Sequence, residues 1–473
     1  MKVVILGAGC TGLGAAYRLH ELGHTDFVVL EQNAYPGGLA TSFIDENGFT
    51  WDIGGHVQFS HYNYFDLLME KALGSAWLNH LRQSYIWMRE RFIPYPFQNN
   101  IRHLPPDELA ACLGGLVAVA GNGHRRPRNF EEWILLSFGQ GIADAFLLPY
   151  NRKVWASPPA QMGFQWIGER VADVNLTRIM ENIVMDRDDP AWGPNNTFRF
   201  PLRGGTGAIW RAVAGLIPTS HFRYRSSVVK INTDARTVLA ATGEEFDYDV
   251  LISTLPMDVL VGLIGERKMI SEAAQLRYSG THVVGVGISG GVPEHLQGKN
   301  WLYFPEDNCP FYRVTVFSNY SPHNVPGEGY WSLMAEVAAS SFRPVDHSTI
   351  VEEVLNGLAT TGLVGQNDRV VSTWHYFAPH GYPTPTCDRD EHLGRIESKL
   401  KPQGILSRGR FGAWRYEVGN QDHCCMQGVE AADNVLFGAP ELTCWHPDLV
   451  NAGHHRDQRT RNVYRPKDSR VYA

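Results

Sequence analysis

Three glycines near the start of the chain have the spacing that binds a phosphate group. Gly7, Gly9 and Gly12 form the pattern G-x-G-x-x-G, and Glu31 lies 24 positions after Gly7. Such glycines let the backbone turn tightly and approach a pyrophosphate, and an acid beyond the next strand accepts hydrogen bonds from ribose hydroxyls. The spacing predicts a dinucleotide site; the alternative is a glycine-rich turn in an ordinary α/β protein.

The segments around these glycines follow the order strand, helix, strand. The apolar run Val3–Leu6 is typical of a buried strand, residues 11–22 carry apolar side chains at helical spacing, and residues 27–31 form a second apolar run. In this order the helix begins at the phosphate and presents its free N–H groups to the negative charge. We therefore expect a Rossmann-like domain at the N-terminus.

Two further glycine pairs indicate which dinucleotide binds. Gly37-Gly38-Leu39 and Gly54-Gly55-His56 follow the second strand, where a nicotinamide-binding domain would usually continue into its next βαβ unit. They suggest loops that lie against a larger flavin, and the segment resembles the FAD-binding domains of the amine oxidase and protoporphyrinogen oxidase superfamily. We therefore predict FAD in preference to NAD.

Three later segments carry side chains suited to chemistry. Residues 301–320 combine Arg313 with several tyrosines; arginine offers a planar fork of donors that stays charged, and tyrosine adds a neutral donor, so a phosphate cleft is one interpretation and plain sheet core is the other. The glycines of residues 409–422 either form an ordinary turn or bring a helix N-terminus to the flavin's pyrimidine end. Arg170 taken alone is typical of a solvated helix face.

Length and composition exclude several classes of protein. A chain of 473 residues that is 44% hydrophobic buries a large core and is expected to form two or three domains. The net charge of -7 argues against nucleic acid as the main partner. No apolar run approaches the roughly 20 residues that span a bilayer, and we expect no signal peptide, no membrane association and a cytoplasmic protein. The seven scattered cysteines are expected to be reduced thiols, and we predict no metal site.

The pattern of elements predicts a discontinuous cofactor domain. Residues 105–167 are mostly helical in pattern, residues 85–92 alternate like a single strand, and residues 282–288, 301–304, 311–317 and 330–337 suggest an antiparallel substrate sheet. The fold class we predict is α/β, with a Rossmann-like FAD-binding domain, a helical domain and an antiparallel β-sheet substrate domain. The expected division is 1–75, 200–260 and 404–452 for the FAD domain, 104–190 for the helical domain, 76–103 and 261–403 for the sheet domain, and 453–473 for a polar tail.

Several long segments resemble one family, the UDP-galactopyranose mutases, and above all their eukaryotic-type branch. The matching stretches include W-D-I-G-G-H-V-Q-F-S-H-Y-N-Y-F-D, P-Y-P-F-Q-N-N, P-Y-N-R-K-V-W-A, I-G-E-R-V-A, W-L-Y-F-P-E-D-N-C-P-F-Y-R, H-G-Y-P-T-P-T and R-G-R-F-G-A-W-R-Y-E-V-G-N-Q-D. They extend from the N-terminus to about residue 450, so the resemblance covers nearly the whole chain.

The resemblance implies an isomerase that converts UDP-galactopyranose to UDP-galactofuranose with no net redox change. In such enzymes N5 of reduced FAD attacks the anomeric carbon and UDP leaves; the covalent flavin–sugar adduct opens, the sugar recloses through its 4-hydroxyl, and UDP returns. The resemblance also suggests NADPH or NADH as the reductant, a UDP-sugar as the binding partner, and a homo-oligomer.

The resemblance also assigns roles to individual residues. Those matching catalytic or diphosphate positions are Arg313, Arg170, His56 and Asn195. Those matching the substrate pocket are Tyr95, Phe97, Gln98, Asn151, Trp155, Trp301, Tyr303, Tyr320, Tyr382 and Tyr416. The predicted cofactor site combines two sets of residues. The glycine motifs and the acid described above contribute Gly7, Gly9, Gly12, Glu31, Gly38, Leu39 and Gly54. The resemblance adds His56, Val228, Arg410, Gly419, Asn420 and Gln421.

A few departures from the family pattern leave alternatives open. Gln58 stands where an aliphatic residue is expected, Asn196 follows Asn195 where a small residue is usual, and the segment at 321–330 is short. A mutase for a related sugar nucleotide therefore remains an alternative. A flavin oxidase or desaturase of the same superfamily would need an apolar tunnel in place of the arginines and tyrosines, and a non-catalytic binding protein would lack His56, Arg313 or Asn420.

Overall fold

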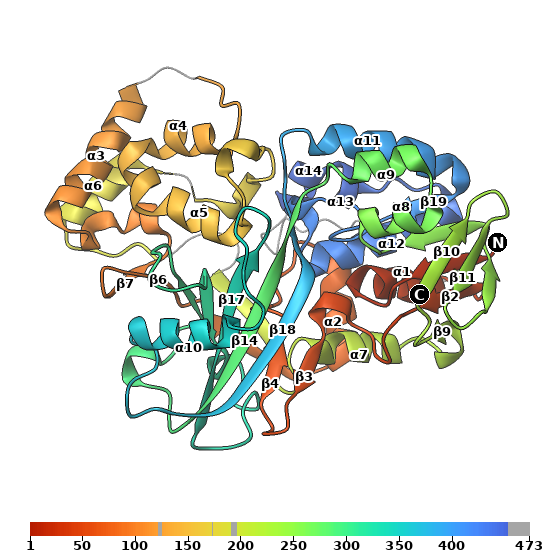
Figure 1. Cartoon of the computed structure of the whole chain (residues 1–473), viewed down its shortest axis with the longest axis horizontal. Helices are drawn as coiled ribbons and strands as arrows, with labels where there is room; N and C mark the ends of the chain where they lie inside the picture. The colour runs from red at the N-terminus through yellow and green to blue at the C-terminus, as the bar shows by residue number, and fades with distance from the viewer. Residues whose placement is uncertain (122–124, 173, 191–195, 453–473) are drawn as a thin grey trace.

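The computed structural model describes residues 1–121, 125–172, 174–190 and 196–452 of the 473-residue chain. Three regions are visible in Figure 1: a helix-covered sheet that combines the red, light-green and blue segments, a helical region in orange and yellow, and a long twisted sheet mainly in green, teal and light blue. The N-terminus lies beside the first of these regions. Segments far apart in sequence therefore build the same part of the molecule.

The first region contains a five-stranded sheet in the order β19-β13-β1-β2-β9. All four strand pairs are parallel. The predicted strand at the N-terminus is confirmed, and the second run ends one residue before Glu31. The strands are β1 (Val3–Leu6), β2 (Phe27–Leu30), β9 (Phe222–Arg223), β13 (Val250–Ser253) and β19 (Ile405–Ser407).

Helices cover both faces of this sheet because each has an apolar side to bury. One hydrophobic core joins the sheet to α1 (Cys10–Glu21), α2 (Asn63–Leu73), α7 (Gly207–Gly215) and α12 (Gln421–Phe437). A second core on the other face joins it to α8 (Met257–Ile264), α9 (Arg267–Ala273), α11 (Arg389–Leu400) and the small sheet of β10 (Val228–Asn232), β11 (Thr237–Ala240) and β12 (Glu245–Asp247). Strands β10 and β11 pair in antiparallel fashion as a hairpin.

The long twisted sheet has seven strands in the order β18-β14-β17-β16-β15-β6-β7. Its pairs are antiparallel except β15 with β6, which is parallel. Helix α10 (Ile350–Thr360) packs into the same core. The strands are β6 (Ser84–Met88), β7 (Arg91–Pro94), β14 (Tyr278–Ser289), β15 (Trp301–Tyr303), β16 (Arg313–Val316), β17 (Tyr330–Ala339) and β18 (Arg369–Pro383).

The single strand predicted over residues 85–92 is wrong. The chain reverses at Arg89 and Glu90, whose φ angles of 53° and 58° are left-handed, and β6 pairs with β7 as a hairpin. The turn escaped prediction because neither residue is one of the glycines or asparagines that usually adopt this conformation.

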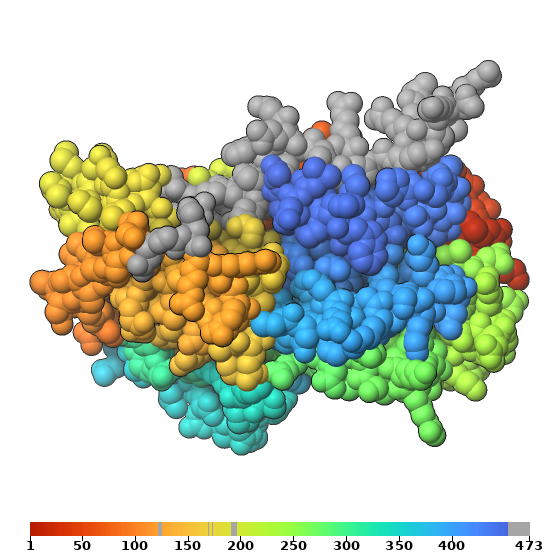
Figure 2. Space-filling model, turned by 90° about the horizontal axis from the view of Figure 1, so that it is seen from above, coloured from red at the N-terminus to blue at the C-terminus, as the bar shows by residue number. Residues whose placement is uncertain are grey.

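The helical region contains α3 (Pro106–Gly121), α4 (Phe130–Ile142), α5 (Leu148–Trp155) and α6 (Leu176–Val184) around one aromatic core. Seen from above in Figure 2, this orange region abuts the light-blue and dark-blue segments of the C-terminal part. The remaining elements are β3 (Ser42–Ile44) paired with β4 (Thr50–Asp52), β5 (Trp77–Leu81) paired with β8 (Thr197–Pro201), α13 (Leu442–Trp445) and α14 (Pro447–Asn451).

The predicted α/β fold class is confirmed: a parallel sheet covered by helices, a helical region, and a second, largely antiparallel sheet. Our numerical division of the chain into domains, including the tail at 453–473 that lies outside the described residues, stays a prediction. Among the described residues no helix has both the length and the hydropathy that crossing a bilayer requires. All seven cysteines are free thiols.

Candidate functional site

The glycine-rich turn joins β1 to α1 and faces the acid beyond β2. Glu31, which is 4% exposed, accepts a hydrogen bond from the backbone N–H of Ala8 at 2.8 Å, and its other oxygen accepts from the backbone N–H of Asn33 at 2.8 Å. The carboxylate thus lies against the turn that would hold a pyrophosphate. Gly12 contributes to packing instead, because a Cβ there would lie 1.9 Å from the carbonyl oxygen of Gly7, so this glycine lets α1 pack against the turn.

One cavity of about 760 Å³ runs from this turn to the twisted sheet. Its volume is within the range of cofactor and ligand sites. The predicted cofactor residues that line it are Gly7, Gly9, Glu31, Gly38, Leu39, Gly54, His56, Val228, Arg410, Gly419, Asn420 and Gln421. The predicted substrate residues that line it are Arg170, Arg313, Tyr95, Trp301, Tyr303, Tyr382 and Tyr416. The fold therefore brings the two predicted sets into one continuous space.

The other predicted site residues that the structure describes do not line this cavity. Gln98 is 2% exposed and donates to the carbonyl of Ala172, and the Asn151 amide donates to the carbonyl of Leu147. Phe97, Trp155 and Tyr320 are buried, and Trp155 borders a second, smaller cavity of about 300 Å³. Asn195 lies outside the described residues. The roles assigned to these residues stay predictions.

A buried acid joins the two sides of the cavity. Glu336 on β17 is 2% exposed, and its oxygens accept from Nε and Nη2 of Arg313 at 2.8 and 2.7 Å. The same carboxylate accepts from the hydroxyl of Tyr312 at 2.7 Å and from the backbone N–H of Gly55 at 2.9 Å. Burial acts to lower the pKa of Arg313, but the Glu336 carboxylate outweighs it and raises that pKa well above its usual value. Arg313 is therefore a fixed cation at the cavity wall.

Sequence reasoning missed Glu336 although its signal was present. The acid interrupts the apolar strand β17, and a lone acid in such a run needs a buried partner. Arg82 was also missed. Its guanidinium lies 5.2 Å from the ring centroid of Tyr95 and 5.0 Å from that of Trp301, and it donates to the hydroxyl of Tyr303 at 3.2 Å. It precedes β6 in a polar segment that carried no signal.

Tyrosines gather around these arginines. The rings of Tyr95 and Tyr303 are 5.1 Å apart, those of Tyr382 and Tyr416 are 5.8 Å apart, and the Arg170 guanidinium lies 5.2 Å over the ring of Tyr416. Burial is the main cause that raises the pKa of Tyr95 and of Tyr382, so both stay protonated at neutral pH. Neutral donors beside fixed cations form a wall that suits a diphosphate.

His56 follows the glycine pair that Glu336 holds. The hydroxyl of Thr206 donates to its carbonyl at 3.4 Å, and its ring Nδ1 is buried with no hydrogen-bond partner among the described residues. Burial lowers the pKa of His56 to about 4, and the nearby Arg410 and Arg313 act in the same direction. The imidazole is therefore neutral at physiological pH.

Helix α12 begins at the cavity with Asn420 as its N-cap residue. Its first-turn N–H groups carry partial positive charge, which favours an anion in front of them. Arg410 adds a full charge beside this end: it donates to the carbonyls of Gly381 and Gly419, each at 3.1 Å. The arrangement suits the negative charge that a reduced flavin carries at its pyrimidine end.

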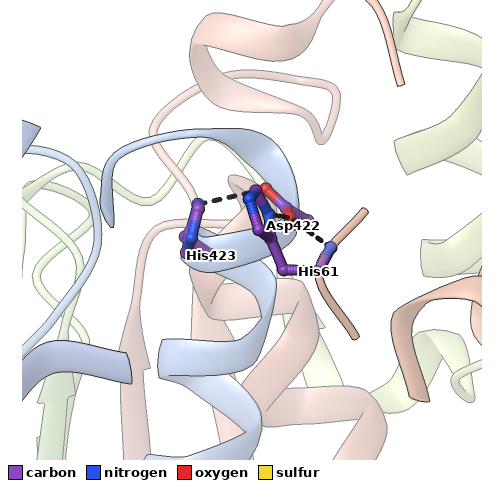
Figure 3. Close-up of side chains that lie close together, drawn as sticks. All are labelled: His61, Asp422 and His423. Atoms are coloured by element: carbon purple, nitrogen blue, oxygen red, sulfur yellow. Dashed lines mark hydrogen bonds and ion pairs between the residues drawn. The ribbon is translucent and has the colours of Figure 1, made fainter. Parts of the chain in front are cut away.

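Two histidines flank a buried acid in the first turn of α12, as Figure 3 shows. Asp422 accepts from the backbone N–H and Nδ1 of His61 at 3.1 and 2.7 Å, and Nδ1 of His423 lies 3.2 Å from its other oxygen. One ligand-capable atom of each residue lies within 4.8 Å of the others. Asp422 thus ties the loop that carries His56 to α12. This arrangement does not test the prediction that the protein has no metal site.

The groups around the cavity fit FAD. At Gly9 a Cβ would meet no atom closer than 3.8 Å, so this glycine leaves open space at the head of α1 for a phosphate. Glu31 lies near the same turn, where a carboxylate suits a ribose, Val228 lines the same cavity, and α12 with Arg410 offers positive charge that suits a flavin anion.

Comparisons with known proteins agree with this geometry. The family model described as flavin containing amine oxidoreductase matches residues 10–436. A solved structure titled reduced UDP-galactopyranose mutase is 50% identical, covers 95% of this chain and 97% of its own, and has a TM-score of 0.93. A putative protoporphyrinogen oxidase from Exiguobacterium sp. 255-15 is 16% identical over 92% of this chain and 98% of its own, with a TM-score of 0.71, and shares the fold.

Among curated proteins, FLOWERING LOCUS D of Arabidopsis thaliana is 26% identical over 378 residues, which are 76% of this chain but 45% of that protein. This chain thus spans about half the length of that relative. The family match and the half-identical structure cover nearly all the elements described above, and they support FAD as the cofactor. The chain belongs to the flavin-containing amine oxidoreductase family and, within it, to the UDP-galactopyranose mutases.

Proposed function

We propose that this protein is an isomerase that interconverts UDP-galactopyranose and UDP-galactofuranose on reduced FAD. One observation carries the proposal: a single cavity joins the dinucleotide turn to a wall of arginines and tyrosines. The family supplies the reaction, and the wall supplies a reason why this chain would bind a sugar nucleotide.

When bound and reduced, FAD supplies the nucleophilic nitrogen of this chemistry. The chain's own residues hold the substrate. Arg313, fixed by Glu336, and Arg170 bind the diphosphate and keep UDP in place after it leaves the sugar, so that it returns to the same carbon. Tyr303, Tyr382 and Tyr416 add neutral hydroxyl donors.

We propose that the reductant is NADPH or NADH, although no second dinucleotide fingerprint occurs in the sequence to mark its docking site. The support is the family resemblance alone. A cytoplasmic location and a homo-oligomer are likewise predictions that rest on the sequence.

A second candidate is a mutase for a related sugar nucleotide. Gln58 lines the cavity and is 4% exposed, and neither atom of its amide has a hydrogen-bond partner among the described residues. A buried amide without partners is costly, so a ligand hydroxyl beside it would be recognised. The turnover of UDP-galactofuranose and of its epimers, measured with the wild type and with Gln58→Leu, distinguishes the two candidates.

The first experiment is a binding test with UDP and, as its matched control, uridine. We expect UDP to raise the melting temperature of the flavin-bound protein and uridine to do so only at much higher concentration, because uridine has no diphosphate for the arginines. Equal shifts of the melting temperature by UDP and uridine would contradict the proposal that this wall binds a diphosphate. No response to UDP would favour an oxidase.

A further inference from the structure

A short turn connects the substrate side of the cavity to its flavin end. Tyr416–Val418 forms one turn of 3-10 helix; Tyr416 lines the cavity, and Gly419 and Asn420 follow at the start of α12. Between these cavity residues, Glu417 is buried at 6% exposure and does not line the cavity. What holds Glu417 therefore sets the position of both walls.

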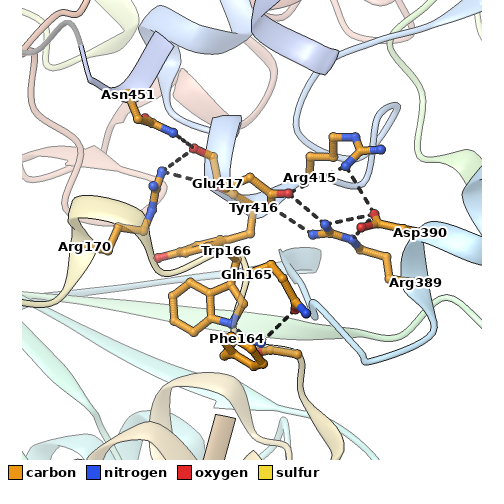
Figure 4. Close-up of polar contacts among 11 residues, drawn as sticks. Phe164, Gln165, Trp166, Arg170, Arg389, Asp390, Arg415, Tyr416, Glu417 and Asn451 are labelled. Carbon is orange, nitrogen blue, oxygen red and sulfur yellow. Dashed lines mark hydrogen bonds and ion pairs between the residues drawn. The ribbon is translucent and has the colours of Figure 1, made fainter. Parts of the chain in front are cut away.

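The Glu417 carboxylate is held from outside the cavity chiefly by Arg389, and Nη1 of Arg415 lies 3.8 Å from one of its oxygens. Nη1 and Nη2 of Arg389, at the start of α11, donate to its two oxygens at 2.8 and 2.7 Å, and Arg389 is 4% exposed (Figure 4). Burial acts to lower the pKa of Arg389, and the Glu417 carboxylate raises it above its usual value. A bidentate pair of this kind fixes direction as well as distance.

The main chain of the same turn holds the predicted diphosphate arginine. Nη2 of Arg170 donates to the carbonyl of Glu417 at 2.7 Å and to that of Tyr416 at 3.5 Å, and Figure 4 shows the side chain reaching the turn from the other side. The guanidinium also lies over the Tyr416 ring. These contacts use Nη2 of the Arg170 guanidinium and leave its other nitrogens available to a ligand.

We infer that Arg389 is a positioning residue for UDP binding: through Glu417 it holds the turn that places Tyr416 and Arg170 at the diphosphate. Arg389 does not line the cavity and acts only through these groups. The inference rests on the proposed function for the ligand, and on the contacts above for the path from α11 to the cavity.

The test measures the affinity for UDP in Arg389→Met, with Arg395→Met as the matched control. Arg395 lies on the same helix, is half exposed and pairs with Glu391 and Glu272 at the surface, so its loss removes the same charge without touching the turn. We expect the dissociation constant of UDP to rise about tenfold in Arg389→Met and to stay unchanged in Arg395→Met. The affinity for uridine should be unchanged in both, which a general loss of structure would not give.

A double-mutant cycle tests the path. In an Arg170→Met background, Arg389→Met should weaken UDP binding by clearly less than the tenfold expected in the wild-type background, because only Tyr416 is left of the two groups that Arg389 positions. Full additivity of the two changes, or wild-type affinity in Arg389→Met, would overturn the inference. If Arg389→Met does not fold, Arg389→Lys replaces it, with an intermediate affinity expected. If the wild type itself fails to bind UDP, the proposed function fails instead.

Discussion

The guanidinium of Arg313 and the carboxylate of Glu336 form a bidentate pair with N–O distances of 2.8 and 2.7 Å at the wall of the cavity. Because Glu336 also holds the backbone of Gly55, the same acid orients the arginine that we propose binds the diphosphate and the glycine pair before His56. The pair therefore fixes the distance between the substrate wall and the flavin loop.

Glu336→Gln is expected to damage both stability and turnover. In the wild type the neighbouring donors face carboxylate oxygens, and in the variant some of them face the amide N–H₂ group instead. This mismatch costs about 1–3 kcal/mol of unfolding free energy. Turnover should fall at least tenfold because Arg313 loses its fixed orientation. Thermal unfolding and steady-state rates check this, with the exposed Glu328→Gln as the control that should change neither.

Arg313→Lys keeps the charge but loses the planar fork. We expect turnover to fall about 100-fold while FAD is retained, because a lysine makes point contacts where arginine binds in bidentate fashion. Flavin content is measured by absorbance, and the rate by product formation. Unchanged turnover would remove Arg313 from the catalytic residues.

Two alanine substitutions in the glycine motif should affect different properties, FAD binding in one variant and stability in the other. The Cβ of Gly9→Ala fits the protein at 3.8 Å from its nearest neighbour, so this variant should fold and lose FAD. The Cβ of Gly12→Ala would lie 1.9 Å from a backbone oxygen, so this variant should lose stability first. Flavin content and melting temperature, measured on both, separate the two roles. A stable Gly9→Ala protein with full flavin would contradict the site.

The buried imidazole of His56 should make stability depend on pH. Its pKa of about 4 in the folded protein lies below the 6.5 of an unperturbed histidine, so the unfolded state binds a proton first as the pH falls. The contribution of His56 is present above pH 6.5 and is lost as the pH falls towards 4.

The melting temperature of the wild type should therefore fall more steeply between pH 7 and pH 5 than that of His56→Asn. Asp52, whose pKa burial raises to about 6, acts in the opposite direction but is common to both proteins. Parallel curves would show that His56 is not held neutral.

The sequence predicted what depends on local pattern. The strand, turn and helix at Val3–Leu6, Gly9 and α1 follow from neighbouring residues, and the structure confirms them. The hairpin at Arg89 and the strand β18 were missed, the first for lack of a turn residue and the second because prolines, glycine and histidines interrupt its apolar pattern.

Pairs formed only in three dimensions could not be found in this way. Glu336 lies 23 residues from Arg313, and Glu417 lies 28 residues from Arg389, so the partners of each pair lie in different elements of the fold. The role of such an acid depends on the partner that the fold places beside it.

The most direct test of the account is the conversion of UDP-galactofuranose by the purified protein, with its flavin first oxidised and then chemically reduced under nitrogen. We predict UDP-galactopyranose as the product only after reduction, because the nucleophile belongs to the reduced flavin. No conversion in either state by protein that holds FAD and binds UDP would contradict the assignment of this substrate, and equal conversion with oxidised flavin would contradict the chemistry.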